Sequence, residues 1–493
     1  MNDHRPWLIA TLPGRCATEC RGEAEEAVRS GADLAEIRVD RWPEEERRGI
    51  ADLFPSPLPL IATYRSQAEG GEGSDDLAIR QAVLGELGRH EFWALDYELA
   101  RDHAPPSGPP HGSILSAHLA EGAPWESVRA LLLRPEGTPR FVKVVVSANV
   151  ADALVLLERA IPPPDEGRFL LHTAGPSGAL FRALAGRLGF AGVYGSLPET
   201  PKRPPVEPSQ IPVRRLRRFL AAAEPAPVYV LLGAAVGRSR SPELFSTWME
   251  ELSDEGLYIT LDIRTEAELA DVLTTLPRYG VRGFNITQPW KVPAFELADR
   301  DGPGAGPCGA ANVLTVVAGE GLEAANTDLA AVLRRLTEWR DGGAWEGREM
   351  LVVGTGGAAR AALSAGKALR AELRILGRNS SSAESLALEF GATVASGRPD
   401  RAASLIVQAT SVGAPGSGPP AIDLLSWVGP GTRVLDFVYD PQDRWLESAA
   451  RSRGAFYEDG YRLLVYQAAE SYAIWFGHNV PPTLLAAALE GPP

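Results

Sequence analysis

The stretch Phe141-Val-Lys-Val-Val-Val-Ser147 is a run of apolar, mostly β-branched residues interrupted by one lysine. A run that is apolar at successive positions is typical of a parallel strand buried on both faces. Seven similar runs flank it within residues 1–223: Trp7–Leu12, Leu34–Asp40, Leu58–Arg65, Phe92–Leu99, Ser113–His118, Phe169–Thr173 and Gly192–Leu197. Helix-like segments follow most of them: Glu19–Ser30, Asp75–Gly88, Pro124–Leu133, Val150–Ala160, Ser177–Leu188 and Val213–Ala223. Eight strand–helix units predict an α/β fold, a closed (β/α)8 barrel.

Three proline-rich segments interrupt this pattern. Between Leu99 and Ser113 the chain reads ARDHAPPSGPPHG, which is too rich in proline and glycine for a helix, so we expect the fourth outer helix to be missing. A loop at Glu199–Pro212 follows the last strand, and Glu224–Pro227 is typical of a short, stiff linker. The linker predicts that residues 1–223 and 228–493 fold separately.

A new series of strands and helices begins at Val228. Strands are expected at Val228–Gly233, Leu257–Ile263, Gly283–Ile286, Val313–Val316, Met350–Gly354, Leu373–Gly377, Ser404–Gln408 and Arg433–Asp436, and closing helices at Tyr461–Gly477 and Pro482–Leu489. This order predicts a two-lobed α/β protein. The first lobe covers residues 228–328 and is completed by residues 461–493, and a Rossmann-type lobe covers residues 329–460.

The composition excludes several classes of protein. The 493 residues carry a formal net charge of −14, which argues against binding to nucleic acid or to an anionic membrane, because phosphates attract basic faces. We expect no transmembrane helix and no signal peptide, since no apolar stretch is long enough. The three cysteines, Cys16, Cys20 and Cys308, are too few for a disulfide framework and lack the neighbours of a zinc site, which favours a reducing cytoplasm.

Barrel enzymes carry their catalytic groups at the carboxyl ends of the strands. In this chain those ends carry Glu36, Arg38, Asp40, Arg65, Asp96, Glu98, His118, Lys143 and His172. A buried lysine is costly unless it has a chemical role, and desolvation beside cations leaves a neutral amine that can attack a carbonyl. His118 is the natural base for a proton next to the resulting imine, oriented by Glu69 or Glu98. In the alternative reading Lys143 lies at a strand edge with its amine in water, which the convergence of histidine and arginines disfavours.

Five segments of the barrel follow a known pattern: EIRVD (Glu36–Asp40), YRSQAEGGE (Tyr64–Glu72), SAH (Ser116–His118), FVKVVV around Lys143, and SGALFR ending at Arg182. They resemble type I 3-dehydroquinate dehydratase over most of residues 7–220. The resemblance implies that Lys143 forms a Schiff base with the C3 ketone of 3-dehydroquinate. It implies that His118, supported by Glu69, moves the C2 proton and assists loss of the C1 hydroxyl. It also implies a set of substrate-binding residues: Glu36, Arg38, Arg65, Arg182 and Gln210.

The chain departs from this family at three places. After His118 it has Leu119 and Ala120 where the family has Asp-Phe, and Ala123 precedes Pro124 where threonine is usual. Val206 replaces a serine four positions before Gln210. These changes predict weaker closure over the substrate and not a loss of the chemistry.

The stretch Met350–Arg360 reads MLVVGTGGAAR, an apolar strand followed by a glycine turn and the start of a helix. Such a turn lets the backbone approach a pyrophosphate at the helix N-terminus, although a lone glycine turn can equally serve packing. The next strand ends at Gly377 and is followed by Arg378 instead of an acidic residue. An acid there would bind the ribose of NAD, whereas an arginine suits the 2′-phosphate of NADP. The pattern therefore predicts an NADP site.

Four polar loops accompany the glycine turn: SRSP (Ser239–Pro242), NITQPWK (Asn285–Lys291), GAANV (Gly309–Val313) and ANTD (Ala325–Asp328). A lysine and an aspartate in one cleft can protonate a carbonyl oxygen during its reduction, although each charge taken singly could be solvated in a loop. In this order and spacing the loops resemble shikimate dehydrogenase over residues 228–493. The departures are GAAVGRS in place of the family's opening GNPIxHS, and Ala331 in place of a glycine.

This second resemblance implies reduction of 3-dehydroshikimate to shikimate with NADPH, with Lys291 and Asp328 as the catalytic pair. It assigns Ser239 and Ser241 to the substrate carboxylate and Tyr439 to the vicinity of the substrate. The ring hydroxyls would be bound by Thr287, Asn312 and Gln467. The NADP site would be lined by Gly354, Gly356, Gly357, Ala358, Arg378, Asn379, Thr410 and Gly460.

The two resemblances support each other, because the product of the dehydratase is the substrate of the dehydrogenase. We therefore expect a metal-free, cytoplasmic bifunctional enzyme that makes shikimate from 3-dehydroquinate. One alternative is a quinate/shikimate dehydrogenase with an inactive barrel, and another is a metabolite-sensing regulator. A regulator should have lost Lys143, Lys291 or Asp328 and gained a DNA-binding segment, yet all three residues are present. The oligomeric state is not evident from the sequence.

Overall fold

The computed structural model describes residues 5–102, 112–132, 139–159, 168–198, 206–222, 224–339, 345–396, 399, 401–414, 417 and 423–491. The chain divides into two compact units. Unit 1 comprises Met1–Val228, Glu255–Asp262 and Asp271–Gly280, and unit 2 comprises Tyr229–Asp254, Ile263–Ala270 and Val281–Pro493. Within the described ranges, no helix is both long and apolar enough to cross a membrane. The separate folding of residues 1–223 and 228–493 stays a prediction.

Unit 1 contains eight parallel strands: β1 (Trp7–Leu12), β2 (Leu34–Arg38), β3 (Leu60–Thr63), β4 (Ala94–Glu98), β5 (Gly112–Leu119), β6 (Phe141–Ser147), β7 (Phe169–Ala174) and β8 (Gly192–Ser196). They are hydrogen-bonded in the order β7-β6-β5-β4-β3-β2-β1-β8, so the last strand returns to the first. At the seam between β7 and β8, the Ala191 amide donates to the Phe169 carbonyl at 2.9 Å. The predicted barrel is confirmed in a nearly closed form.

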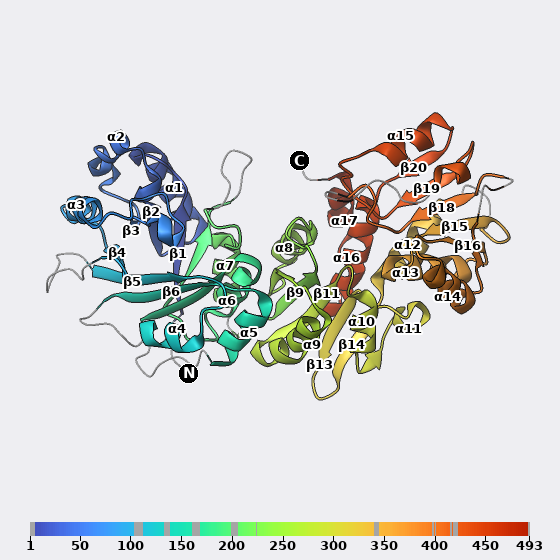
Figure 1. Cartoon of the computed structure of the whole chain (residues 1–493), viewed down its shortest axis with the longest axis horizontal. Helices are drawn as coiled ribbons and strands as arrows, with labels where there is room; N and C mark the ends of the chain where they lie inside the picture. The colour runs from blue at the N-terminus through green and yellow to red at the C-terminus, as the bar shows by residue number, and fades with distance from the viewer. Residues whose placement is uncertain are drawn as a thin grey trace. The chain divides into compact units, whose positions relative to one another are not determined.

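Helices connect these strands and lie around them (Figure 1): α1 (Ala17–Ser30), α2 (Glu44–Arg47), α3 (Leu77–Leu87), α4 (Trp125–Leu132), α5 (Val150–Arg159), α6 (Gly178–Leu184) and α7 (Val213–Leu220). Helix α1 shows why they end where they do. It buries the small side chains of Cys20, Ala24 and Ala27, and it stops at Gly31, whose φ of 86° is a left-handed conformation that suits glycine. The predicted lack of a fourth outer helix concerns residues 103–111, which lie outside the described residues.

The interior of the barrel has an apolar floor and a polar tier. The floor takes one residue from each strand, and these pack in one cluster: Ile9, Leu34, Ile61, Ala94, Ile114, Phe141, Leu170 and Tyr194. Side chains alternate along a strand, so the residue two positions later points into the same interior. Those residues form the polar tier: Thr11, Glu36, Thr63, Asp96, Ser116, Lys143, His172 and Ser196. The alternation thus gathers eight polar side chains above one hydrophobic layer.

A second sheet has the strand order β10-β9-β11-β13-β14-β12. Its strands are β9 (Val228–Gly233), β10 (Leu257–Asp262), β11 (Val281–Ile286), β12 (Arg300–Asp301), β13 (Val313–Val317) and β14 (Gly321–Ala325). Strand β13 runs antiparallel to both β11 and β14. Nearby helices are α8 (Ser241–Glu251), α9 (Glu266–Thr275), α10 (Lys291–Glu296), α11 (Ala305–Cys308), α12 (Thr327–Glu338), α16 (Tyr461–Phe476) and α17 (Pro482–Glu490). Helix α16 packs against α12, α8 and α17, and the assignment of the C-terminal helices to the first lobe stays a prediction.

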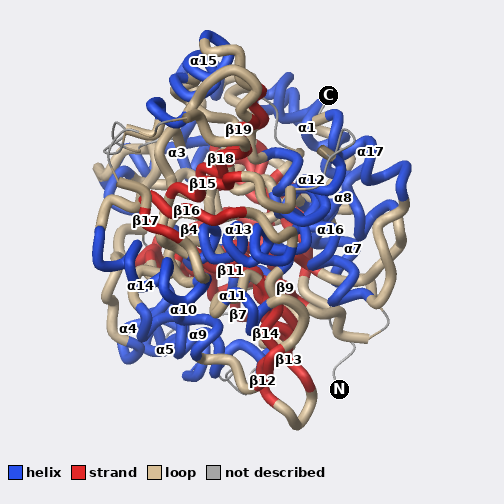
Figure 2. Tube along the Cα trace, turned by 90° about the vertical axis from the view of Figure 1, so that its right-hand side faces the viewer, coloured by secondary structure: helices blue, strands red, loops and turns tan. Residues whose placement is uncertain are grey.

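The third sheet is parallel, with the order β17-β16-β15-β18-β19-β20. Its strands are β15 (Glu349–Val353), β16 (Glu372–Leu376), β17 (Thr393–Val394), β18 (Leu405–Gln408), β19 (Arg433–Asp436) and β20 (Phe456–Glu458), and its helices are α13 (Gly357–Ala368), α14 (Ser380–Phe390) and α15 (Trp445–Ser452). Helix α13 lies beside the strands in Figure 2 and contacts β15, β16 and β18. The strand order reverses at β15, which is where Rossmann-type sheets bind nucleotides. The predicted Rossmann-type lobe is confirmed.

Candidate active sites

Lys143 lies in the polar tier of the barrel between two carboxylates. Its Nζ is 2.6 Å from Asp96 Oδ2 and 3.4 Å from Glu36 Oε1, and its side chain is only 6% exposed. The amine also lies 4.7 Å from the centre of the Tyr194 ring. The alternative in which Lys143 extends to water is therefore wrong for the free chain.

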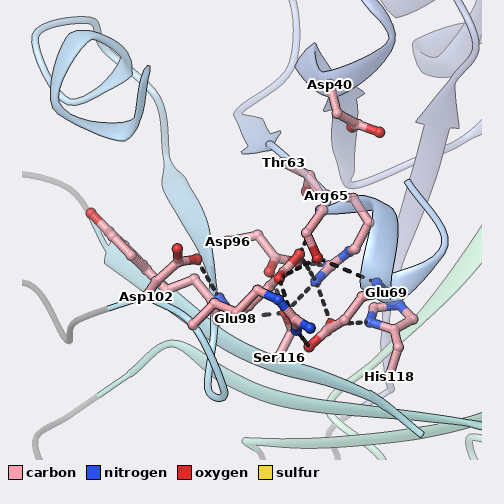
Figure 3. Close-up of polar contacts among 12 residues, drawn as sticks. Asp40, Thr63, Arg65, Glu69, Asp96, Glu98, Asp102, Ser116 and His118 are labelled. Atoms are coloured by element: carbon pink, nitrogen blue, oxygen red, sulfur yellow. Dashed lines mark hydrogen bonds and ion pairs between the residues drawn. The ribbon is translucent and has the colours of Figure 1, made fainter. Parts of the chain in front are cut away.

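Arg65 binds the carboxylates of β4 and of the segment that follows β3 (Figure 3). One guanidinium nitrogen is 2.9 Å from Asp96, and the other is 3.0 Å from Glu69 and 3.2 Å from Glu98. The second nitrogen also donates to Ser116 Oγ at 2.9 Å, and Ser116 in turn donates to Asp96. Burial alone would raise the pKa of Asp96, but the charges of Arg65 and Lys143 hold it below its usual value. Asp96 therefore positions the lysine amine and does not accept its proton.

His118 and Glu69 form a hydrogen-bonded pair beside Arg65 (Figure 3). His118 Nδ1 is 2.9 Å from Glu69 Oε2. Burial, together with the charges of Arg65 and Lys143, holds the pKa of His118 well below its usual value, so the imidazole is neutral near pH 7. Burial raises the pKa of Glu69 to about 7, against the opposing charge of Arg65. Glu69 can therefore hold the neutral imidazole of His118, the candidate base, in one orientation.

The remaining predicted residues of the barrel lie around the polar tier. Arg38 makes two hydrogen bonds to Asp40, at 2.9 and 2.8 Å. Gln210 Nε2 donates to Thr11 Oγ1 at 3.0 Å. Arg182 is 3% exposed and pairs with Glu207 at 3.0 Å, so it reaches a substrate only if these contacts change.

Unit 2 brings Lys291 and Asp328 together. Lys291 Nζ is 2.5 Å from Asp328 Oδ2, and the two side chains are 13% and 8% exposed. Asn312 Nδ2 lies 3.2 Å from the other Asp328 oxygen and 3.3 Å from Gln467 Oε1, while Asn312 Oδ1 accepts from the Thr327 amide at 2.7 Å. The side-chain amide of Asn312 is therefore hydrogen-bonded to other residues of the protein. These hydrogen bonds orient the carboxylate of Asp328.

The predicted carboxylate-binding serines lie at the start of α8. The Ser241 amide donates to Ser239 Oγ at 3.2 Å. Burial raises the pKa of Tyr439, against a hydrogen bond with Ser239, so the phenol stays protonated as a donor. Thr287 follows β11, where its amide donates to the Leu232 carbonyl at 2.8 Å. Ser239, Thr287 and Tyr439 thus lie on loops, and Ser241 is the first residue of α8.

The glycine turn fits a dinucleotide. Gly354 has a φ of 121°, and a Cβ on it would lie 2.9 Å from the Ala409 carbonyl oxygen. A Cβ on Gly356 would meet nothing within 4 Å, which leaves open space before the amides that begin α13. A Cβ on Gly357 would lie 2.6 Å from Lys291, so the turn adjoins the pair of Lys291 and Asp328. These features leave room for a pyrophosphate next to that pair.

The nucleotide's other contacts would come from the ends of neighbouring strands. Arg378 follows β16 and is exposed, and Asn379 caps α14 by accepting from the Ser382 amide at 3.0 Å. Thr410 follows β18 and donates to Gln408 at 2.6 Å. Gly460 precedes α16, where a Cβ would lie 2.3 Å from the Phe437 carbonyl oxygen. These residues and Ala358 at the start of α13 fit the predicted NADP site.

The chain resembles known proteins over both units. Residues 8–226 match the family model of type I 3-dehydroquinase, and residues 231–314 match that of the shikimate dehydrogenase substrate binding domain. The NADP(+) shikimate dehydrogenase of Dinoroseobacter shibae is 35% identical over 274 residues, which cover 53% of this chain and 97% of that protein. The chain belongs to the shikimate dehydrogenase family.

Other proteins similar to this chain include further shikimate dehydrogenases. The enzyme of Acidiphilium cryptum is 36% identical over 251 residues, 50% of this chain and 89% of that protein. Among solved structures, shikimate dehydrogenase from Aquifex aeolicus has a TM-score of 0.49 at 25% identity and covers 54% of this chain and 99% of that one. A structure of dehydroquinate dehydratase and shikimate dehydrogenase from S. pombe has a TM-score of 0.43 at 21% identity, with 99% of both chains covered.

The sequence did not predict the side chains that position the candidate catalytic residues through hydrogen bonds and ion pairs. Asp96 received no role, although it lies closer to Lys143 than Glu36 does. Thr63, which donates to Glu36 at 2.9 Å, and Ser116 were not singled out either. The signal was available, because each lies two residues after a floor residue of its strand. Thr327, which bonds Asn312 in the dehydrogenase, has no comparable signal.

Proposed function

We propose that the chain catalyses two consecutive reactions in the cytoplasm, each in its own site. In the barrel, 3-dehydroquinate loses water through a Schiff base on Lys143 and becomes 3-dehydroshikimate. In the dehydrogenase region, 3-dehydroshikimate is reduced to shikimate with NADPH. The observation that carries the proposal is the pairing of a buried lysine and a partly buried lysine with acidic partners, Lys143 with Asp96 and Lys291 with Asp328, inside regions similar to these two families.

The dehydratase step uses the polar tier and the rim above it. The Lys143 amine adds to the C3 ketone, a C=N bond replaces C=O, and water leaves. His118 removes the C2 proton, the electron pair moves toward the imine, and the C1 hydroxyl leaves with a proton as a second water. Hydrolysis of the imine returns the lysine. Glu36, Arg38, Arg65, Arg182 and Gln210 are proposed to hold the substrate.

In the dehydrogenase, Lys291 and Asp328 are proposed to handle the proton on the C3 oxygen, and Asn312 orients the aspartate. Ser239 and Ser241 would bind the carboxylate, and Thr287, Tyr439 and Gln467 would face the ring. Gly354, Gly356, Gly357, Ala358, Arg378, Asn379, Thr410 and Gly460 would hold NADP. When bound, that nucleotide supplies the reducing equivalents. The chain's own residues supply the proton and exclude water from the reacting carbon.

One coupled assay tests both steps. The chain is incubated with 3-dehydroquinate and NADPH, and shikimate is measured. In separate arms, 3-dehydroshikimate is followed by absorbance without NADPH, and shikimate oxidation is followed with NADP. Shikimate oxidation without turnover of 3-dehydroquinate would refute the dehydratase half and indicate a dehydrogenase with an inactive barrel.

The pH dependence of the dehydratase should follow Glu69. A proton added to Glu69, with a pKa of about 7, turns this carboxyl into a donor toward Nδ1 of His118, so the imidazole proton moves to Nε2 and the base is lost. We expect kcat/KM to fall as the pH drops through about 7 and to stay high above it. In Glu69→Gln this inflection should disappear, because the pKa of His118 lies well below its usual value.

The matched control for this profile is Glu72→Gln. Glu72 is an exposed glutamate paired with Arg15 at 3.0 Å. Its replacement should leave the inflection in place. A wild-type profile without an inflection near neutrality, or one that persists in Glu69→Gln, would contradict the assignment.

Arg378 should set the preference for NADP. A charge-assisted contact with the 2′-phosphate is worth about 1.5–3 kcal/mol, so Arg378→Ala should lower kcat/KM with NADP roughly tenfold to a hundredfold and leave NAD little changed. Shikimate oxidation with each nucleotide measures this. Arg401→Ala, which removes a 72% exposed arginine from the same lobe, is the control. Equal losses with both nucleotides would show that Arg378 does not bind the phosphate.

A further inference from the structure

His172 is a buried histidine in the polar tier that the mechanism above does not use. It lies on β7 two residues after the floor residue Leu170, and it is paired in register with Val145 of β6. The residue is 1% exposed, and neither ring nitrogen has a hydrogen-bond partner among the residues that the structure describes. A buried imidazole in this state costs free energy unless a ligand completes its hydrogen bonds.

The wall of the barrel around His172 has other polar atoms in the same state. The Tyr194 hydroxyl, Ser196 Oγ and Gln210 Oε1 are buried and lack a partner within the described ranges. By contrast, Glu36 and Asp96 across the polar tier are bonded to several side chains. The unpartnered atoms therefore gather on the side formed by β7, β8 and the loop before α7.

This wall adjoins the reactive amine. The His172 and Tyr194 rings meet edge to face, with centres 6.0 Å apart, and Lys143 Nζ lies 4.7 Å from the centre of the same Tyr194 ring. A molecule bound covalently to Lys143 would thus place a neighbouring group next to the imidazole. Within the described part of the chain, no residue makes a hydrogen bond to a nitrogen of that ring.

We propose that His172 binds a hydroxyl group of the dehydratase substrate, next to the carbonyl carbon that Lys143 attacks. The proposal rests on the dehydratase function proposed above. A neutral imidazole has one donor and one acceptor, and a hydroxyl also donates and accepts, whereas a carboxylate only accepts. The ring is neutral because burial and the charges of Arg182 and Lys143 hold the pKa of His172 well below its usual value, with the Leu171 backbone acting in the opposite sense.

The test compares His172→Leu with His172→Gln in the full chain, using 3-dehydroquinate. In His172→Leu the substrate hydroxyl is buried without a partner, so KM should rise about tenfold to a hundredfold. The kcat should change far less, because the bond is present in both the bound substrate and the transition state. His172→Gln, which keeps a donor and an acceptor, should recover most of the affinity.

Stability separates binding from a structural role. The free chain has an imidazole without partners, so His172→Leu should raise the unfolding temperature of the barrel or leave it unchanged. The control is Thr173→Val, whose wild-type hydroxyl donates to the Ser177 carbonyl at 2.9 Å and is buried. That variant should lose stability and keep its KM.

An unchanged KM in His172→Leu would overturn the proposal, and so would a fall in unfolding temperature that His172→Gln restores without restoring affinity. If the wild-type chain does not convert 3-dehydroquinate, the proposed dehydratase function itself fails. The two failures are therefore distinguishable.

Discussion

Replacing Lys143 by methionine is expected to abolish the dehydratase reaction and to spare the dehydrogenase. Loss of a covalent nucleophile lowers kcat on the order of 10⁴- to 10⁶-fold. The substitution also removes the cation between Asp96 and Glu36, which leaves two buried carboxylates with fewer partners. Breaking such a buried pair costs about 3–5 kcal/mol, so the barrel should also lose stability.

Lys143→Arg separates chemistry from folding. Its guanidinium keeps the positive charge beside Asp96 but stays protonated and forms no imine. This variant should fold like the wild type and remain inactive as a dehydratase. Borohydride added with 3-dehydroquinate should attach substrate mass to the wild-type peptide that contains Lys143. An active wild-type enzyme that gives no adduct would indicate a non-covalent mechanism.

The second large effect is expected for Lys291→Met. Removal of a general acid lowers kcat about 10²- to 10⁴-fold, so shikimate oxidation should fall by this factor. The KM for NADP should change much less, because the proposed contacts with the nucleotide come from the glycine turn and Arg378. Asp328 keeps its hydrogen bond with Asn312 at 3.2 Å, which limits the loss of stability.

Two controls accompany Lys291→Met. Lys367→Met removes an exposed lysine of the Rossmann-type lobe and should leave kcat unchanged. Lys143→Met and Lys291→Met should each abolish one activity and spare the other. If either variant abolished both activities, the two sites could not be treated as separate.

The sequence predicted the eight barrel strands well because each is apolar at successive positions and follows a turn. The short strands β12, β14, β17 and β20 were not predicted, since strands of two to five residues carry little pattern of their own. Likewise, the contact between Lys143 and Asp96 joins β6 to β4 across β5. This contact depends on how neighbouring strands are staggered relative to one another. The spacing of residues along a single strand gives no information about that stagger.

Roles within the sites were harder to predict than positions. The sequence placed His118 and Lys143 at strand ends; this is right for His118 near the end of β5 but wrong for Lys143, which is the third residue of β6. The structure nevertheless brings both into the network around Arg65 and Asp96. The sequence could not predict that Arg182 would be bound to Glu207 and to backbone carbonyls, because that depends on how α6 packs. For the same reason, the hydrogen bonds that Asn312 makes within the protein could be known only from the fold.

The two-layer interior of the barrel makes the dehydratase site sensitive to the length of its strands. Every polar tier residue reaches the interior only because it stands two positions after a floor residue. One inserted or deleted residue between Phe141 and Lys143 would turn the lysine outward and point an apolar neighbour inward. Insertions in the loops beyond the strands do not change which side chains of a strand point into the barrel. Gene variants of this enzyme should therefore tolerate changes of length between strands and reject them within the strands.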